Sequence, residues 1–302
     1  MGLSGSLRPP ASVHLEDSVS ASPTASLLDG AAVLVTGASS GIGVELARQM
    51  APRAKVLVLV ARRIDRLERL EEELLAQHRH LVVLVRGCDL TDRAATDAML
   101  ASVEEAAGGI DVLVNNAGFG DLGVFDRADW DKTERMIALN VTALTYLTHR
   151  LLPAMIARGR GGVLNISSSF GLSFMPGFSV YIGTKHYVTA FTESLRIDVA
   201  GTGVTITQIC PGPVRTEFND KLGNFTGLEL PGFVQIDAAA CARAAVRGFE
   251  RGRAMILPGM FIRVLMALNA LSPRWLKRLF YGPIGRKLRQ IQARAESSPA
   301  KT

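Results

Sequence analysis

Residues 31–43 read AAVLVTGASSGIG and carry the strongest indication of the fold. The first six residues of this stretch form a short apolar run, which leads through a glycine-rich turn into a predicted helix that ends near Met50. A turn in this place directs backbone N–H groups and the positive end of the helix toward a pyrophosphate. The spacing is G-x-x-x-G-x-G, which differs from the common G-x-G-x-x-G fingerprint. Its position between a strand and a helix nevertheless predicts a dinucleotide-binding fold.

Outward from this stretch, strand-like and helix-like segments alternate along the chain. The predicted strands cover residues 31–36, 55–61, 81–86, 110–115, 162–167 and 204–210. The later predicted helices cover residues 65–77, 92–107, 130–152 and 181–200. Apolar strands that alternate with helices are typical of a parallel sheet with helices on both faces. With right-handed crossovers, the pattern predicts a single α/β, doubly wound, Rossmann-type domain with a C-terminal helical extension.

Composition divides the chain into three parts. Residues 1–29 are rich in Ser, Ala and Pro and lack periodicity, which predicts a disordered leader. Residues 30–258 hold the alternating segments and would form the dinucleotide-binding and catalytic domain. Residues 259–302 hold nine Lys or Arg and one Glu, a net charge of +8, so the other residues sum to −2 of the total of +6. The basic character therefore belongs to this partly amphipathic C-terminal extension.

The cysteines and the absence of long apolar runs bear on the compartment. Cys88, Cys210 and Cys241 are odd in number and widely spaced, which argues against a disulfide framework and against a zinc cluster. We therefore expect no metal site. The first residues lack the basic and apolar regions of a secretory signal, and no apolar run is long enough to predict a membrane span. These features favour a cytoplasmic protein.

The end of the second predicted strand indicates which dinucleotide binds. An acidic residue about 20 residues beyond the glycine turn holds the ribose of NAD, whereas an Arg there accommodates the 2′-phosphate of NADP. Here the strand ends in Val60-Ala61-Arg62-Arg63, without a carboxylate. Two guanidinium groups offer bidentate donors to a phosphate, so the sequence predicts NADP. The alternative is that both arginines are solvated residues at the start of a charged helix.

Tyr181 and Lys185 lie four residues apart at a predicted helix start, so they share one face of the helix. An ammonium group near a phenol lowers the tyrosine pKa toward working pH, which suits acid–base catalysis at a carbonyl. Ser168 lies thirteen residues before Tyr181, where its hydroxyl could hydrogen-bond a substrate oxygen. Taken singly, these features are also explained by a surface pair and by ordinary turn chemistry.

Together with further motifs, these features resemble the short-chain dehydrogenase/reductase family, in its NADP-type subgroup, over about residues 30–258. TGASSGIG at 36–43 is similar to the family's cofactor loop, and NNAG at 115–118 is similar to the signature that supports the central sheet. PGPVRT at 211–216 resembles the segment beside the nicotinamide, and Asp89 falls where the family binds the adenine. The resemblance implies these cofactor-binding residues: Gly37, Ser39, Ser40, Gly41, Ile42, Gly43, Arg62, Arg63, Asp89, Asn116, Ala117, Gly118, Tyr181, Lys185, Pro211, Gly212, Val214 and Thr216.

The same resemblance implies a catalytic tetrad of Asn140, Ser168, Tyr181 and Lys185. It implies hydride transfer between the nicotinamide and the carbonyl or alcohol carbon of a substrate. Tyr181 would donate a proton to the carbonyl oxygen during reduction, and Ser168 would fix that oxygen. Lys185 would lower the pKa of Tyr181 and bind the ribose hydroxyls, while Asn140 would support a water chain that resupplies protons.

Two apolar segments indicate a hydrophobic substrate. Residues 217–235 contain six Phe or Leu residues where the family places its mobile substrate loop. Residues 170–178 would either line one wall of an apolar pocket or pack in the core. The sequence does not name the substrate or the physiological direction, and we expect a homo-oligomer of unspecified order. Two other functions stay open: a catalytically silent NADP-binding regulatory or scaffold protein, and an NADP-dependent epimerase of nucleotide sugars.

The C-terminal extension has a composition of its own. Residues 256–271 are apolar but contain Arg263 and the Pro258-Gly259 break, so they are too interrupted to predict a bilayer span. Residues 272–294 mix basic with aromatic and aliphatic side chains, which is typical of a helix lying on anionic lipid. Nucleic acid is a less suitable partner for such apolar content. The alternatives are a cap over the substrate pocket and an oligomer contact.

Overall fold

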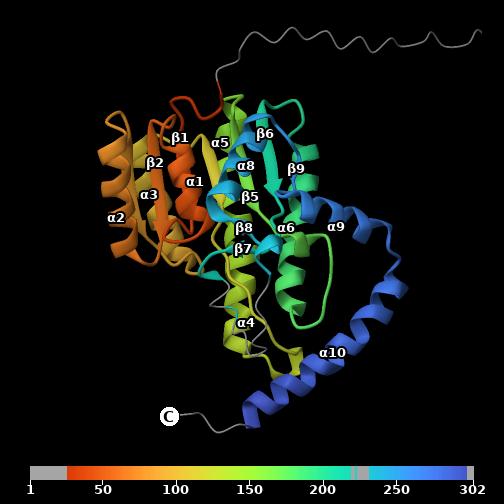
Figure 1. Ribbon diagram of the computed structural model, residues 1–302. Helices are drawn as coiled ribbons and strands as arrows, with labels where there is room; N and C mark the ends of the chain where they lie inside the picture. Colours follow the sequence, from red (N-terminus) through yellow and green to blue (C-terminus); the bar gives the residue numbers. More distant parts are fainter. Residues whose placement is uncertain (1–25, 219–221, 223–230, 298–302) are drawn as a thin grey trace, which may run out of the picture.

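The chain is built around one parallel sheet, shown in the computed structural model of Figure 1. The structure describes residues 26–218, 222 and 231–297. The strand order is β3-β2-β1-β4-β5-β6-β9. The strands are β1 (Ala32–Thr36), β2 (Val56–Ala61), β3 (Val82–Gly87), β4 (Val112–Asn115), β5 (Gly161–Ile166), β6 (Val204–Ile209) and β9 (Met255–Ile256). The order reverses between β1 and β4, and ligands of doubly wound sheets bind at that point. The predicted fold class is confirmed.

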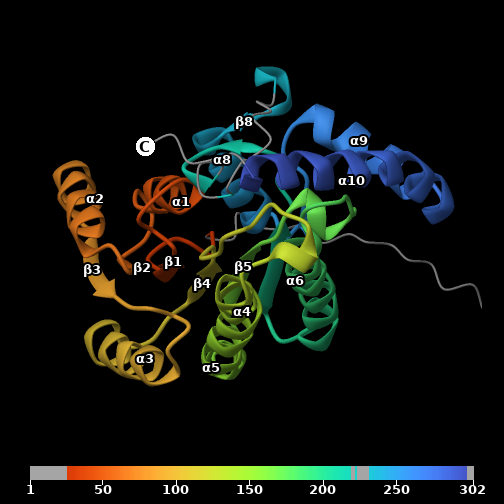
Figure 2. The ribbon, with the colours of Figure 1, turned by 90° about the horizontal axis from the view of Figure 1, so that it is seen from below.

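Helices cover both faces of the sheet, and each face has its own buried core (Figure 2). Along β1, Val33 and Val35 belong to one core, whereas Leu34 belongs to the other. Both faces are buried because successive side chains of a strand point to opposite sides. The first core includes residues of α1 (Ile42–Met50), α2 (Ile64–Gln77) and α8 (Ala238–Glu250). The second includes residues of α3 (Arg93–Ala107), α5 (Leu144–Ala157) and the segment after α6 (Ser179–Asp198).

The helix predicted over residues 130–152 is interrupted. The structure has α4 (Trp130–Ile137), a π-helical turn (Ala138–Ala143) and α5. The turn contains Asn140, whose amide nitrogen donates to Phe119 O at 2.9 Å and to Thr184 Oγ1 at 3.1 Å. Single π-helical turns commonly occur at functional positions, since they displace one residue from the regular helical path. Apolar periodicity does not reveal such a turn.

The boundaries of the folded domain differ from the expected ones. Leu28 is fully buried, Ser26 Oγ donates to Glu250 at 2.6 Å, and Arg53 Nε donates to Asp29 at 2.7 Å. Residues 26–29 therefore belong to the folded domain and not to the leader predicted for residues 1–29, of which 1–25 lie outside the described residues. The structure also adds β9 and α8, which the periodicity of the sequence did not predict.

The C-terminal extension consists of two helices, α9 (Met260–Leu271) and α10 (Arg274–Ser297), with the predicted break at residues 258–259 preceding α9. Figure 1 shows α10 as a long arm that runs from the end of α9 along one side of the domain. Among the described residues, no helix, α9 and α10 included, combines the length and the hydropathy that a transmembrane span requires.

Candidate active site

The residues predicted from sequence gather at one edge of the sheet, where the carboxyl ends of its parallel strands lie. The turns after β1, β2, β3, β4 and β6 contain the expected cofactor residues, which are 37–43, 62–63, 89, 116–118 and 211–216. Ser168 follows β5, and Asn140 lies in the π-helical turn. Tyr181 and Lys185 lie in the first two turns of α6. A sheet of this topology binds its ligand at this edge.

The glycine-rich turn forms a cradle that side chains would fill. Gly37 and Gly41 have φ values of +66° and +58°, which favour glycine. A Cβ on Gly43 would lie 2.3 Å from Gly37 O, and a Cβ on Gly41 would lie 3.0 Å from Thr216 Cγ2. No side chain caps the start of α1, so its first N–H groups are directed to this space. The residues present therefore fit a pyrophosphate at the positive end of α1.

Thr36 and Asn116 hold this cradle against the turn after β4. Thr36 Oγ1 donates to Val114 O at 3.1 Å and accepts from the N–H groups of Asn116 at 2.9 Å and Ala117 at 3.0 Å. Asn116 Nδ2 in turn donates to Thr36 O at 2.8 Å and to Gly37 O at 3.2 Å. The two strands on either side of the topological switch are thereby linked at the point where the dinucleotide would lie.

Tyr181 is a buried phenol among aromatic rings. Burial raises its pKa to about 12, against a hydrogen-bonding contribution from Ser168 that acts in the opposite direction. The hydroxyl oxygen of Ser168 also accepts from Phe170 N at 3.1 Å, which fixes the serine side chain beside the phenol. At neutral pH Tyr181 is therefore protonated and can donate its proton to an adjacent oxygen.

Lys185 occupies the next turn of α6, on the same face as Tyr181. Its amine lies 5.8 Å from the centre of the Tyr181 ring and donates to Ile166 O at 2.8 Å. Burial lowers its pKa to about 8. Burial has the largest effect on the pKa of Tyr181 in the cofactor-free chain, so the lowering expected from Lys185 stays a prediction for the complex with the dinucleotide.

Asn140 completes the group from the π-helical turn. Its carboxamide exchanges hydrogen bonds with the backbone of Phe119, accepting from N at 3.1 Å and donating to O at 2.9 Å. A Cβ added to Gly118 would lie 3.0 Å from Asn140 Oδ1 and 3.8 Å from Lys185 Nζ. The glycine therefore permits the turn after β4, Asn140 and the lysine amine to meet at one place.

The two arginines after β2 have different surroundings. Arg63 donates to Ser39 Oγ of the glycine-rich turn from Nε at 3.3 Å and from Nη2 at 3.2 Å. Arg62 has a side chain that is 71% exposed and lies 3.7 Å from Asp89. The structure thus brings Arg63 to the cradle, whereas Arg62 lies at its rim beside the residue expected to bind adenine.

Glu217 and Arg66 join Arg63 beside the cradle, and the sequence motifs predicted neither of them. Glu217 forms ion pairs with Arg66 and, at 3.0 Å, with Arg63. Hydrogen bonds from Arg66 and Arg63 lower the pKa of Glu217 to about 2. Arg63 and Glu217 are 154 residues apart in the sequence. Arg66 lies three residues after Arg63, so the two side chains share one face at the start of α2. This spacing was the one signal in the sequence that could have placed Arg66 in the group.

The segment after β6 lies against the cradle. Pro211 O accepts from Ser169 N at 2.8 Å, and Val214 pairs with Ile236 in a short parallel ladder of β7 (Val214–Arg215) and β8 (Ile236–Asp237). Thr216 follows this ladder and approaches Gly41 closely. The predicted cofactor residues of this segment are therefore adjacent to the glycine-rich turn in space.

Aromatic and aliphatic side chains surround the phenol of Tyr181. The ring centres of Phe218, Phe170 and Phe178 lie 5.7, 6.2 and 6.5 Å from that of Tyr181. A Cβ on Gly120 would lie 2.9 Å from Leu222. The apolar wall expected from residues 170–178 is present. Of the predicted loop over residues 217–235, residues 219–221 and 223–230, with Phe225, Leu228 and Leu230, lie outside the described residues.

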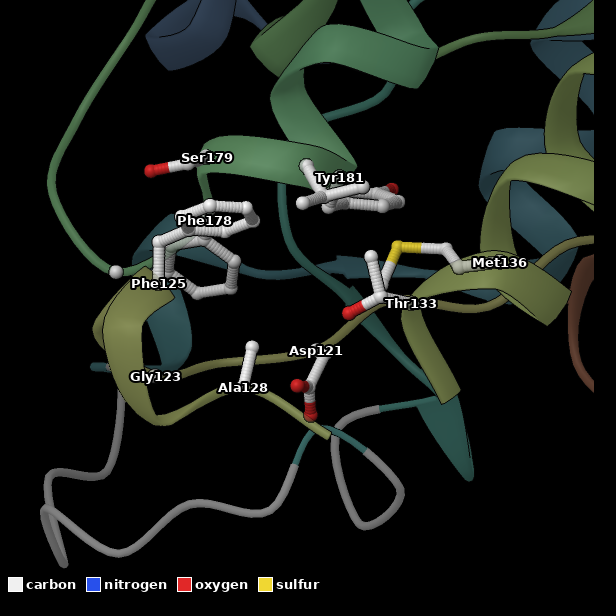
Figure 3. A pocket seen from close by; sticks show the side chains of 11 residues that line it. Asp121, Gly123, Phe125, Ala128, Thr133, Met136, Phe178, Ser179 and Tyr181 are labelled. Carbon is white, nitrogen blue, oxygen red and sulfur yellow. The ribbon is translucent and has the colours of Figure 1, made fainter. Parts of the chain in front are cut away.

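A small cavity of about 20 Å³ opens beside Tyr181, between the start of α6 and residues 121–136. Figure 3 shows Tyr181 and Phe178 above it, facing Thr133, Met136 and Asp121. Its volume is close to that of a single water molecule.

The described residues contain no group of three or more His, Cys, Asp or Glu that could hold a metal ion. Cys88, Cys210 and Cys241 are buried, and none forms a disulfide.

Comparisons with known proteins agree with this geometry. The family model described as "short chain dehydrogenase" matches residues 31–226. The chain is 40% identical over 189 residues to "NADP-dependent 3-hydroxy acid dehydrogenase YdfG" of Salmonella typhi, covering 62% of this chain and 74% of that protein. It is 36% identical over 202 residues to "Glycine betaine reductase ATRR" of Emericella nidulans, covering 67% of this chain but only 16% of that protein.

A solved structure shows the same similarity in three dimensions. It is a short-chain dehydrogenase from Sphingobium yanoikuyae in complex with NADPH, with a TM-score of 0.71 and 32% identity over 80% of this chain and 93% of that chain. The family model alone matches well over half of the 302 residues. The chain therefore belongs to the short-chain dehydrogenase/reductase family and is an oxidoreductase that depends on a nicotinamide cofactor.

Proposed function

We propose that this protein is an NADPH-dependent reductase of a predominantly apolar aldehyde or ketone, which it converts to the alcohol. The observation that carries the proposal is the buried phenol of Tyr181, which lies among aromatic rings, with its ring centre 5.8 Å from the Lys185 amine, and is protonated at neutral pH. A base for alcohol oxidation would need the phenolate, which burial disfavours here.

The proposed cofactor residues are those at the carboxyl edge of the sheet. Residues 37–43 would hold the pyrophosphate, Asp89 the adenine side, and residues 116–118 and 211–216 the nicotinamide side. When bound, the nicotinamide supplies or accepts the hydride. Arg63 supports NADP over NAD, since it already lies against Ser39 of the cradle and no carboxylate ends β2. Arg66 is a further candidate for the 2′-phosphate.

Each member of the tetrad has a proposed task. Tyr181 donates its proton to the carbonyl oxygen as negative charge develops there, and Ser168 donates a hydrogen bond to the same oxygen. Lys185, whose amine already reaches the end of β5 through Ile166 O, would hold the ribose hydroxyls and favour the phenolate that the reaction leaves. Asn140 fixes the backbone of Phe119 beside them and would support the water chain that restores the proton.

The substrate class follows from the surroundings of the phenol. Phe170, Phe178, Phe218 and Leu222 supply the surface around Tyr181, and the nearby carboxylate of Asp121 is paired with Lys132. Such a lining stabilises an apolar substrate body, while the polar contacts are confined to the reacting oxygen. The complete tetrad also argues against the silent scaffold that the sequence left open.

A homo-oligomer is the proposed assembly. The outer faces of α5 and α6 expose apolar side chains, including Ile156, Tyr187 and Ile197. Tyr187 stacks on Phe191 at 5.8 Å, and its hydroxyl lies 3.0 Å from Thr145 Oγ1, which joins the two helices into one surface. Self-complementary helix surfaces of this kind suit a twofold interface. Sedimentation of wild type and an Ile197→Asp variant tests this proposal.

The proposed reaction is tested by following NADPH consumption with a panel of aliphatic and aromatic aldehydes and ketones. Tyr181→Phe should lower turnover by about a hundredfold or more while NADPH affinity stays within about twofold, because the phenol serves the proton transfer. Apolar carbonyl compounds should be preferred over charged ones of similar size. Near-normal turnover in Tyr181→Phe would show that another group is the acid, and consumption of no carbonyl compound would refute the reductase.

A further inference from the structure

The C-terminal helices carry an unusual share of exposed apolar surface. Twenty large apolar side chains are exposed in the described part of the chain, and eleven of them lie in α9 and α10. The eleven are Met260, Phe261, Val264, Leu265, Leu268, Leu271, Trp275, Leu276, Leu279, Phe280 and Ile284. We call this group the α9–α10 surface. Large contiguous apolar patches on a folded protein generally mark an interaction site.

The exposed apolar side of α9 lies opposite the side that packs on the domain. One side of the helix already contacts the domain: Ile262 and Met266 are buried, and a Cβ on Gly212 would lie 2.3 Å from Ile262. On the same side, Asn269 Nδ2 donates to Leu172 O at 2.9 Å. The opposite side repeats large apolar residues at helical spacing from Met260 to Leu271, and Leu271 is 82% exposed. A helix that is apolar on both sides has a second face to cover.

The charge of α9 and α10 indicates what kind of partner covers the α9–α10 surface. No Asp or Glu occurs from residue 251 to residue 295. The carboxylate contacts described for α10 lie at its far end, where Arg289 pairs with Asp126 at 2.8 Å and Glu296 pairs with Arg127. Six cations lie nearer the exposed apolar residues, and none of them forms an ion pair with a carboxylate among the described residues. They are Arg263, Arg274, Lys277, Arg278, Arg286 and Lys287.

We propose that the α9–α10 surface docks this protein on an anionic lipid bilayer. Exposed aromatic and aliphatic side chains enter the boundary between head groups and acyl chains, and the surrounding cations contact the anionic head groups. A second copy of the chain fits less well, because a twofold contact through this surface would bring its unpaired cations together without any carboxylate between them. This docking does not depend on the reaction proposed above.

The docked arm also reaches the substrate side of the catalytic site. Gln292 is buried and accepts from Val124 N at 2.8 Å, and a Cβ on Gly177 would lie 2.6 Å from Leu288. Val124 and Gly177 belong to the two segments that surround the cavity beside Tyr181. Docking through α9 and α10 therefore places the approach to Tyr181 near the bilayer, from which an apolar carbonyl compound can enter.

The two tryptophans of the chain allow a matched experiment. Trp275 lies in the α9–α10 surface and is 65% exposed, whereas Trp130 lies in α4 and is 63% exposed. Trp130→Phe leaves Trp275 as the only tryptophan reporter, and Trp275→Phe leaves Trp130. Vesicles of phosphatidylcholine mixed with phosphatidylglycerol should shift the emission of Trp275 to shorter wavelength, and brominated acyl chains should quench it. The emission of Trp130 should change much less, because Trp130 lies outside the α9–α10 surface.

Charge-reversal variants distinguish docking on anionic lipid from nonspecific hydrophobic adsorption to vesicles. Each cation near an anionic surface contributes roughly fivefold in affinity, so Arg286→Glu with Lys287→Glu should weaken vesicle binding by at least about 25-fold. The control pair Arg243→Glu with Arg251→Glu, exposed at and just after α8, should bind as wild type does. Binding should also weaken as salt rises, because the attraction is screened beyond about 8 Å at physiological ionic strength.

Three results would overturn the proposal. Unchanged Trp275 emission with anionic vesicles at low salt would exclude docking through this surface. Equal binding to pure phosphatidylcholine vesicles would exclude the role assigned to the cations. Concentration-dependent dimers that Leu268→Ser dissociates, together with unchanged Trp275 emission, would assign the surface to a second copy of the chain. Activity in detergent-free buffer is measured in parallel, so that a failed docking result is distinguished from a failed catalytic proposal.

Discussion

Replacing Lys185 with methionine tests whether the folded site holds a desolvated amine. Burial lowers the pKa of Lys185 from 10.5 to about 8. Unfolding returns the amine to water, so the unfolded chain binds more protons than the folded chain between about pH 8 and pH 10.5. The stability of wild type should therefore rise with pH across this window. The cost of burying the charged amine is fully present below pH 8 and is removed above pH 10.5.

The size of the effect follows from the same two values. The difference between 10.5 and about 8, at 1.36 kcal/mol for each pH unit, amounts to about 3 kcal/mol. Between pH 7 and pH 9.5 only part of that window is crossed, so wild type should gain about 2 kcal/mol relative to Lys185→Met. Loss of the hydrogen bond to Ile166 O costs the variant about 1 kcal/mol at every pH. Lys185→Met should therefore be the more stable protein at pH 7 by about 2 kcal/mol, although it loses activity.

The assay is urea unfolding of both cofactor-free proteins at pH 7 and at pH 9.5, with the free energy of unfolding extrapolated to water. Lys55→Met removes an exposed lysine and serves as the control for loss of a surface lysine. The advantage of Lys185→Met should shrink to near zero at pH 9.5, because the lysine is then mostly neutral in the folded chain. A difference between the two proteins that stays constant with pH would refute the desolvated amine.

Three further predictions concern the dinucleotide. Arg63→Ala should weaken NADPH binding about tenfold and change NADH binding little. Arg62→Ala should weaken NADPH binding less, because Arg63 contacts Ser39 whereas Arg62 is largely solvated. Equal effects of the two substitutions in calorimetric titration would contradict this assignment. Glu217→Gln should tighten NADPH binding about two- to fivefold, since the carboxylate competes with the 2′-phosphate for Arg63 and Arg66; weaker binding would show that the glutamate instead positions the arginines. Gly43→Ala should abolish binding of both dinucleotides, because the new Cβ would lie 2.3 Å from Gly37 O; a folded variant, checked by circular dichroism, that binds normally would refute the close packing of the cradle.

Much of the fold could be predicted from local pattern. The strands from β1 to β6 lie within two residues of their expected positions, because near-continuous apolar runs are a direct consequence of burial on both faces of a sheet. The helix faces of Tyr181 and Lys185 follow from a spacing of four residues. The cradle follows from glycines at positions that have no room for a side chain. β9 has only two residues, Met255 and Ile256, and so short a segment carries no periodicity.

The parts of the site that could not be predicted depend on contacts between remote segments. Glu217 meets Arg63 across 154 residues, and the choice of Arg63 over Arg62 depends on which side chain the β2–α2 turn directs toward Ser39. The π-helical turn places the carboxamide of Asn140 against the backbone of Phe119, 21 residues earlier in the chain. No local pattern encodes these partners, since the sequence neighbours of each residue are not its neighbours in space.

The doubly wound α/β fold, the glycine-rich dinucleotide turn and the Tyr–Lys pair on one helix face could all be predicted from the chain, because these properties depend on local periodicity and on residue size. The pKa shifts of Tyr181 and Lys185 and the exposure of the C-terminal helices depend instead on contacts that form only when the chain folds. Burial by distant residues sets the pKa of Tyr181 and of Lys185. Packing of Ile262 and Met266 against the domain decides which side of α9 is left exposed. Both effects are sums over neighbours that folding brings together, which a linear pattern does not contain.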